Sequence, residues 1–250
     1  MANWNDPQPT KTGFGASPSV AVPSVGRTTF DAGLRRHMLS IYNYMASGVL
    51  LSGIVAMLFS AGGETSAAAR VMGSGLGIVV MLAPLAFVLV MSFGINKLST
   101  TALQACFWGF ATVMGLSLST IFLVYTGASI AATFFATAGA FAGLSLYGYT
   151  TQRSLTGMGS FLIMGVVGIL IASLINMFLQ SPGLYWAISI LGVLIFAGLT
   201  AYDTQKLKEQ YQYVRGTDMA GKVVIMGALN LYLDFINMFM FLLRFMGDRR

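Results

Sequence analysis

Charged residues are scarce in this sequence, and cysteine and histidine are nearly absent. Only 9% of the 250 residues are Asp, Glu, Lys or Arg, whereas a soluble domain carries about 25%. The single cysteine, Cys106, cannot form an internal disulfide, and the single histidine, His37, has no Cys or carboxylate neighbour that would suggest a metal site. With 56% hydrophobic residues, the composition excludes an ordinary soluble domain and predicts a polytopic membrane protein in a lipid bilayer.

A cluster of basic residues is also lacking, although the net charge is +6. The basic residues are scattered over loops and are not interleaved with aromatic side chains, as they would be on a nucleic-acid-binding surface. We therefore expect no nucleic-acid partner. We also expect no cleavable signal peptide, because the first hydrophobic run begins late and is too long for such a signal.

The N-terminal segment differs in composition from the rest of the chain. Four of the six prolines lie within its first 23 residues, at Pro7, Pro9, Pro18 and Pro23. The segment is polar and cannot bury enough apolar surface to fold. The sequence therefore predicts a flexible tail over residues 1–33 and a single membrane domain over residues 34–250.

Seven apolar segments are long enough to cross a bilayer, which takes about 20 residues. They cover residues 38–60, 72–95, 103–125, 128–149, 159–179, 184–205 and 223–246. Pro84 in the second segment predicts either a kink or an opened backbone hydrogen bond. Gly139 and Gly143 form a G-x-x-x-G motif in the fourth segment, which we expect to pack within the bundle. The predicted fold class is an all-α membrane protein, a bundle of seven transmembrane helices.

Basic residues in the loops predict the orientation of the bundle. They precede the first segment, follow the second and fourth, and separate the sixth from the seventh. They are Arg27, Arg35, Arg36, Lys97, Arg153, Lys206, Lys208, Arg215 and Lys222. The positive-inside rule then places the N-terminus in the cytoplasm. The C-terminal Arg249 and Arg250 fall on the opposite side, against this trend.

Two carboxylates lie inside the predicted spans. Asp203 ends the sixth segment, and Asp234 lies near the middle of the seventh. At 100° per residue, Asn230 and Asn237 lie within about 60° of Asp234, so the three side chains form one polar stripe. Because a charge at this depth is costly and usually functional, we expect the stripe to face protein or water and to line a polar path.

The two aspartates, if they meet, would not both ionise easily in a medium of low dielectric constant. They would instead share one proton. Deprotonation would force the site to rearrange, to recruit a base such as Lys97, or to bind a divalent cation. Carboxylate oxygens are the ligands that Ca²⁺ prefers, so Asp203 and Asp234 are also candidate transient calcium ligands. The alternatives are a solvated helix-end Asp203 paired with Lys206 and a structural hydrogen-bond acceptor at Asp234.

Several motifs together resemble one known family. The strongest is LYLDFIN at residues 231–237, which continues to LLRF at residues 242–245. It is supported by Tyr202 and Asp203 at the end of the sixth segment, by MGLSLS at residues 114–119 and by LSLYGYT at residues 144–150. Over about residues 34–250 the chain resembles the bacterial branch of the Bax inhibitor-1 (transmembrane Bax inhibitor motif) family. The resemblance implies a seven-helix bundle with the C-terminal helix at its centre.

The resemblance also implies a function, since some members of that family are pH-dependent calcium leaks. Asp203 and Asp234 match the paired aspartates that sense pH and close the pore. Lys97 falls near the family's basic partner, an arginine where known, and a lysine offers a point charge instead of a bidentate fork. By the same resemblance we expect a bacterial inner membrane location, calcium and protons as ligands, and no resident cofactor.

Two other functions compete with the leak. A non-transporting regulator that binds other membrane proteins, such as a membrane protease, would make use of the flexible tail, and the oligomeric state stays open. An intramembrane aspartyl protease would need Gly-x-Gly-Asp where this chain has Leu231-Tyr232-Leu233-Asp234. It would also need a Pro-Ala-Leu element, and no proline follows Pro182. We therefore expect no enzymatic activity.

Overall fold

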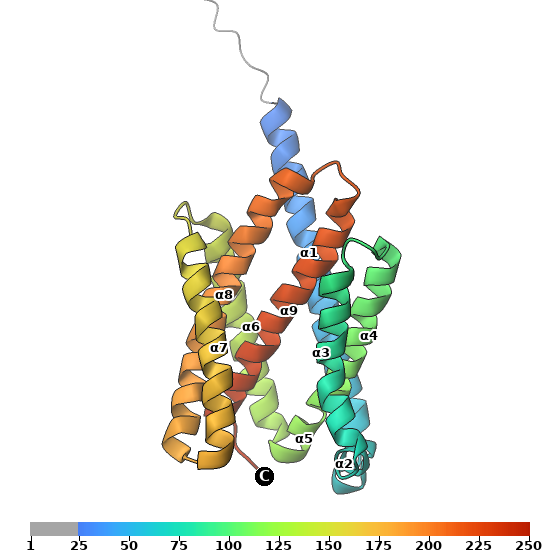
Figure 1. The fold of residues 1–250 in the computed structure, drawn as a ribbon, viewed down its shortest axis with the longest axis vertical. Helices are drawn as coiled ribbons and strands as arrows, with labels where there is room; N and C mark the ends of the chain where they lie inside the picture. The colour runs from blue at the N-terminus through green and yellow to red at the C-terminus, as the bar shows by residue number, and fades with distance from the viewer. Residues whose placement is uncertain (1–24) are drawn as a thin grey trace, which may run out of the picture.

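The computed structural model describes residues 25–250, so most of the predicted tail lies outside the described residues. Within this range the predicted all-α fold is confirmed (Figure 1). The helices are α1 (Val25–Ser60), the short 3-10 helix η1 (Gly63–Thr65), α2 (Ala67–Met72), α3 (Leu76–Gly94), α4 (Thr100–Leu118), α5 (Thr120–Val124), α6 (Gly127–Thr150), α7 (Thr156–Leu179), α8 (Pro182–Val214) and α9 (Met219–Met246). Helix α1 thus begins well before the predicted domain boundary at residue 34.

Among the described residues, seven helices are long and apolar enough to cross a membrane, as predicted. Helices α4 and α5 together form one of them, Thr100–Val124. Two helices extend well beyond their predicted bounds: α1 begins at Val25 instead of near residue 38, and α8 continues to Val214 instead of ending near residue 205. Lys, Leu, Glu and Gln in this extension favour helix, and the helix stops where Gly216 adopts a φ of 74°. The extension packs Tyr211 against His37 of α1, with ring centroids 5.2 Å apart.

Helix α9 packs against α1, α4, α6 and α8, and it crosses the bundle obliquely between the α7–α8 pair and the α3–α4 pair (Figure 1). It is the most buried span, since 61% of the residues in its most apolar stretch are buried, against 39% or fewer in each of the others. A polar side chain on α9 therefore faces protein on most sides. Because protein and not lipid surrounds most of α9, a carboxylate can lie on this helix within the membrane interior.

Pro84 opens a backbone hydrogen bond within α3, which is one of the two effects predicted for it. A proline has no N–H, so the carbonyl four residues earlier, that of Val80, loses its partner within the helix. Ser117 of α4 takes this place and donates to Val80 O at 2.6 Å. The proline is therefore compensated by a hydroxyl from the neighbouring helix, as buried backbone in a membrane requires.

The expectation that Gly139 and Gly143 pack within the bundle is wrong. Both glycines are exposed, and a Cβ added to either would meet no atom within 4 Å. The face that α6 turns inward carries Thr133, Thr137, Phe141, Ser145 and Gly148 instead. On a helix with 100° between residues, Gly139 and Gly143 lie on the side opposite Phe141. The close approach of α6 to α8 occurs at Gly148, where an added Cβ would meet the backbone of Ala201.

The connections fall into two groups at the two ends of the bundle. The α3–α4, α6–α7 and α8–α9 connections lie at the same end as the start of α1, while the C-terminus lies at the other end (Figure 1). At the end that holds the C-terminus, Arg249 forms a β-bridge with Tyr125 and donates a hydrogen bond from Nη2 to Tyr185 OH at 2.8 Å. The loops predicted to be cytoplasmic thus share one end, and which side of the membrane that end faces stays a prediction.

Candidate functional site

The two carboxylates singled out from the sequence meet in the interior of the bundle. The side chains of Asp203 on α8 and Asp234 on α9 lie close enough to interact electrostatically and within reach of a hydrogen bond. Asp234 is 5% exposed, and its Oδ2 has no hydrogen-bond partner in the described part of the chain. An ionised carboxylate can only accept hydrogen bonds, so a hydrogen bond between the two groups would need a proton on at least one of them. The arrangement is therefore one in which two carboxyl groups can share a proton.

Asp203 is positioned by neighbours on α8 that contact other helices. The backbone of Ala201 lies directly against Gly148 of α6, where only a residue without Cβ fits. The ring of Tyr202 lies against Gly159 of α7, in contact with the position that a Cβ would occupy. These two glycines let α6 and α7 approach α8 closely, as small residues do in membrane bundles.

The two residues that follow Asp203 continue this pattern. Thr204 Oγ1 donates to Ser145 Oγ of α6 at 3.4 Å. Gln205 reaches the α6–α7 connection, where its Nε2 donates to Arg153 O at 2.9 Å and its Oε1 accepts from Leu155 N at 2.7 Å. Because successive residues on a helix point 100° apart, contacts made by neighbouring residues fix the rotation of α8. The direction of the carboxylate between them is fixed with it.

Lys97, predicted as the basic partner, is exposed on the connection after α3. Its neighbour Ile95 accepts a hydrogen bond at 3.0 Å from Lys222 Nζ, which places this connection beside the first turn of α9. From Lys222 to Asp234 the helix rises about 18 Å. The cation that acts electrostatically on Asp203 is instead Lys206, one turn further along α8. The structure thus brings the aspartates together without Lys97, whose role stays a prediction.

Asn230 and Asn237 are half-buried on α9. The Nδ2 atom of Asn237 donates to Leu233 O of its own helix at 2.8 Å. The half-buried residues of this part of α9 recur every three or four positions: Met226, Asn230, Leu233, Asn237 and Met240. This spacing makes one stripe along the face of α9 that the other helices cover least. The role of the two asparagines in lining a polar path stays a prediction.

The role of the aspartate pair as transient calcium ligands stays a prediction. Within the described residues, no group of three or more His, Cys, Asp or Glu side chains could hold a metal ion. Calcium takes about six to eight oxygen ligands, of which this pair supplies only part.

A second buried polar cluster, which joins α1, α4 and α9, was not predicted. Ser52 Oγ lies 2.6 Å from Ala111 O and 2.6 Å from Tyr232 OH. A serine hydroxyl has one hydrogen, which it donates to a carbonyl, so the Tyr232 hydroxyl must donate to Ser52. All three residues are fully buried. Tyr232, two residues before Asp234, was the available signal in the sequence, since a buried tyrosine hydroxyl needs a hydrogen-bond partner.

Comparison with known proteins agrees with these features. The family described as "Inhibitor of apoptosis-promoting Bax1" matches residues 34–250. Uncharacterized protein RP147 of Rickettsia prowazekii is 47% identical over 228 residues, covering 89% of this chain and 93% of its own length. Inner membrane protein YbhL of Escherichia coli is 46% identical over 221 residues, covering 88% of this chain and 94% of its own. None of these descriptions names an enzyme. The chain therefore belongs to the Bax inhibitor family of membrane proteins, as the motifs in its last span predicted.

Proposed function

We propose that this protein is a pH-sensitive calcium leak of a bacterial inner membrane, gated by the contact between Asp203 and Asp234. The observation that carries the proposal is the contact itself, a pair of carboxyl groups between two membrane-spanning helices. With one proton shared, the pair holds α8 and α9 together. Loss of that proton leaves two like charges at contact distance in a medium of low dielectric constant.

The repulsion would be relieved by movement of α8 and α9 relative to each other. Asp203 belongs to a stretch of α8 that is tied to α6, to α7 and to their connection, and α9 is the most buried span. Their relative movement would separate the carboxylates and expose Asn230 and Asn237 on the half-covered face of α9. The freed carboxylate oxygens are then ligands for a passing divalent cation. The inner membrane assignment follows the relative YbhL.

The proposal predicts that the pH dependence of calcium flux requires both carboxyl groups. Wild type, Asp203→Asn and Asp234→Asn are reconstituted in liposomes, and calcium flux is measured as a function of pH. Wild type should conduct with a clear pH dependence. Both variants should give a flat profile, because an amide does not titrate and still offers a hydrogen bond to the remaining carboxyl group.

Glu209→Gln is the matched control, since Glu209 is an exposed carboxylate two turns further along α8. It should keep the wild-type profile. Flux that is absent from wild type, or equally pH-dependent in both Asn variants, would contradict the leak. Absent flux would favour instead the non-transporting regulator, which is tested by capture of a membrane protein that depends on the N-terminal tail.

The shared proton can be detected independently of transport. Infrared spectra of the purified wild type should contain a protonated-carboxyl band that decreases as pH rises. The pH dependence of the band should change in Asp203→Asn and in Asp234→Asn, because each variant leaves one carboxyl group beside an amide that does not titrate. A band with the same pH dependence in wild type and in both variants would show that the two groups do not share a proton, whatever the outcome of the flux experiment.

A further inference from the structure

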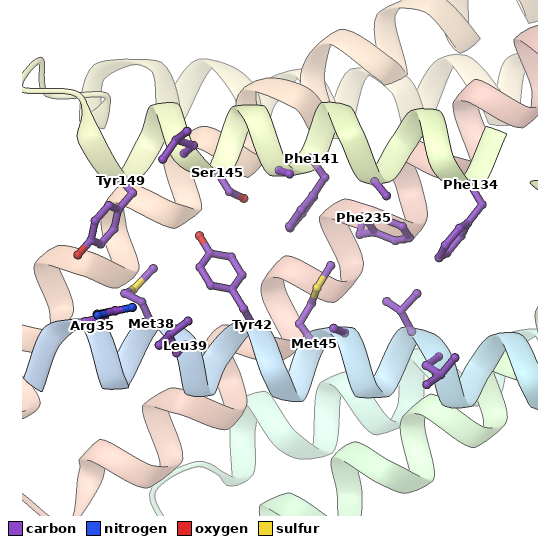
Figure 2. A pocket seen from close by; sticks show the side chains of 16 residues that line it. Arg35, Met38, Leu39, Tyr42, Met45, Phe134, Phe141, Ser145, Tyr149 and Phe235 are labelled. Carbon is purple, nitrogen blue, oxygen red and sulfur yellow. The ribbon is translucent and has the colours of Figure 1, made fainter. Parts of the chain in front are cut away.

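A lateral groove between α1 and α6 is not used by the proposed gate. Its volume is about 790 Å³, within the range of about 300–1,000 Å³ that is usual for ligand sites. Both flanking helices pack on α9, which contributes Phe235 to the groove. Figure 2 shows Phe134, Phe141 and Phe235 together towards one end, with Met45 between them and the other end. This part of the groove offers only apolar and aromatic side chains.

Figure 2 shows Arg35 and Tyr149 at the other end of the groove, beside Met38 and Leu39, with Tyr42 and Ser145 next along it. Lys208 lies near this end without lining the groove, since its Nζ donates to Tyr149 O at 2.7 Å and lies 5.4 Å from the centre of the tyrosine ring. The groove is therefore apolar over most of its lining, with one cation and two tyrosines at this end.

A second, more open hollow adjoins this end, and all the residues that line it lie on α1, so it is a stretch of the outward face of that helix. It has a volume of about 410 Å³ and shares Arg35 and Leu39 with the groove. Its other lining residues are Ala32, Arg36, Ser40 and Asn43. No acidic residue lines either hollow in the described part of the chain. Two guanidinium groups with nearby polar side chains suit a phosphate, which arginine can bind through two parallel hydrogen bonds.

The length of the groove suits an acyl chain. From Arg35 to Leu50 the groove follows α1 for about 22 Å, more than the roughly 15 Å of hydrocarbon in one leaflet. The groove is thus long enough for one acyl chain that starts at the membrane surface.

We propose that this groove binds one anionic glycerophospholipid. Its phosphate lies in the second hollow against Arg35 and Arg36, and one acyl chain follows the groove towards Phe141 and Phe235. The basic hollow and the apolar groove meet at Arg35, in the same order as phosphate and acyl chain in a phospholipid. The site lies on the outer faces of α1 and α6, and its occupancy does not depend on ion conduction.

The test is the binding of lipid to the full chain in detergent, followed by native mass spectrometry. Dioleoyl phosphatidylglycerol and dioleoyl phosphatidylcholine are titrated separately, since they have the same acyl chains and differ in net charge. Wild type should bind one phosphatidylglycerol about tenfold more tightly than phosphatidylcholine, as expected when charge-assisted hydrogen bonds hold the phosphate of an anionic headgroup. Arg35→Ala should remove most of this preference.

Ala142→Trp should abolish the tight binding event for both lipids, because the indole would fill the groove that Ala142 lines. Ala140→Trp is its matched control, on the same helix and exposed outside the groove. Arg153→Ala is the control for Arg35→Ala, since Arg153 is an exposed cation at the same end of the bundle. Both controls should bind as wild type does.

Four results would overturn the proposal. They are equal binding of the two lipids by wild type, wild-type binding by Ala142→Trp, an equal loss of binding in Ala140→Trp, and displacement of phosphatidylglycerol by an equal concentration of free oleate. The last result would assign the groove to a fatty acid. The first would leave only the general contact that lipid makes with any membrane protein.

Discussion

Gly148→Val is expected to lower the free energy of unfolding by about 3 kcal/mol, at the upper end of the cost of overpacking. A Cβ at this position would lie against the backbone oxygen of Ala201, with its carbonyl carbon at 2.9 Å and its Cα at 3.0 Å. Side-chain ends can rotate away from such a contact, whereas the backbone of a packed helix cannot. Valine would therefore push α6 away from α8, two residues from Asp203.

The measurement is thermal unfolding in detergent, with Gly139→Val as the matched control. Gly139 lies on the same helix, is exposed, and has no atom within 4 Å of an added Cβ. The two variants carry the same chemical change, so any effect of valine on helix propensity is common to both. Only Gly148→Val should lose stability. Equal stabilities would show that α6 and α8 do not meet at Gly148.

Tyr232→Ala is expected to cost about 3–5 kcal/mol of folding free energy, the usual cost of truncating a buried large aromatic side chain. Tyr232 is fully buried, and its ring packs edge-to-face on Phe110 with centroids 5.0 Å apart. Its hydroxyl also donates to Ser52. The truncation would leave a cavity where α1, α4 and α9 meet, two residues from Asp234, so the register of the gate helix would loosen as well.

Tyr232→Phe measures the contribution of the hydroxyl group to stability separately from that of the aromatic ring. It should cost only about 1 kcal/mol, because it removes one hydrogen bond while Ser52 keeps its carbonyl acceptor. Tyr213→Ala is the control for loss of an aromatic ring, since Tyr213 is 82% exposed and should be close to neutral. The expected order of stability is Tyr213→Ala, Tyr232→Phe and then Tyr232→Ala. A Tyr232→Ala variant as stable as Tyr213→Ala would refute the packing described for α9.

Local properties of the chain were predictable from the sequence. The number of spans, the two carboxylates inside them and the family all follow from runs of apolar residues and short motifs. One of the two effects predicted for Pro84, an opened backbone hydrogen bond, is found for the same reason, since the loss of an N–H concerns a single helix. The extension of α8 to Val214 was missed because a helix can continue past the apolar stretch that marks a span.

Contacts between distant segments were not predictable. The G-x-x-x-G pattern at Gly139 and Gly143 indicated a surface able to pack, but the inward face of α6 carries Gly148 instead. Lys97 was proposed from its position along the chain, and the structure places it beside the start of α9. The groove between α1 and α6 had no sequence signal, because its two walls lie about 100 residues apart.

The sequence alone predicted Asp234 as a membrane-embedded carboxylate on a polar stripe and Asp203 as the other acidic residue within the predicted spans. Whether the two touch depends on the rotation and height of α8 relative to α9. The tertiary structure decided this through contacts at Gly148, Gly159 and Gln205, which lie on different elements. Helical periodicity predicts which residues share a face of one helix. The register between two helices depends instead on how side chains from the whole bundle pack together.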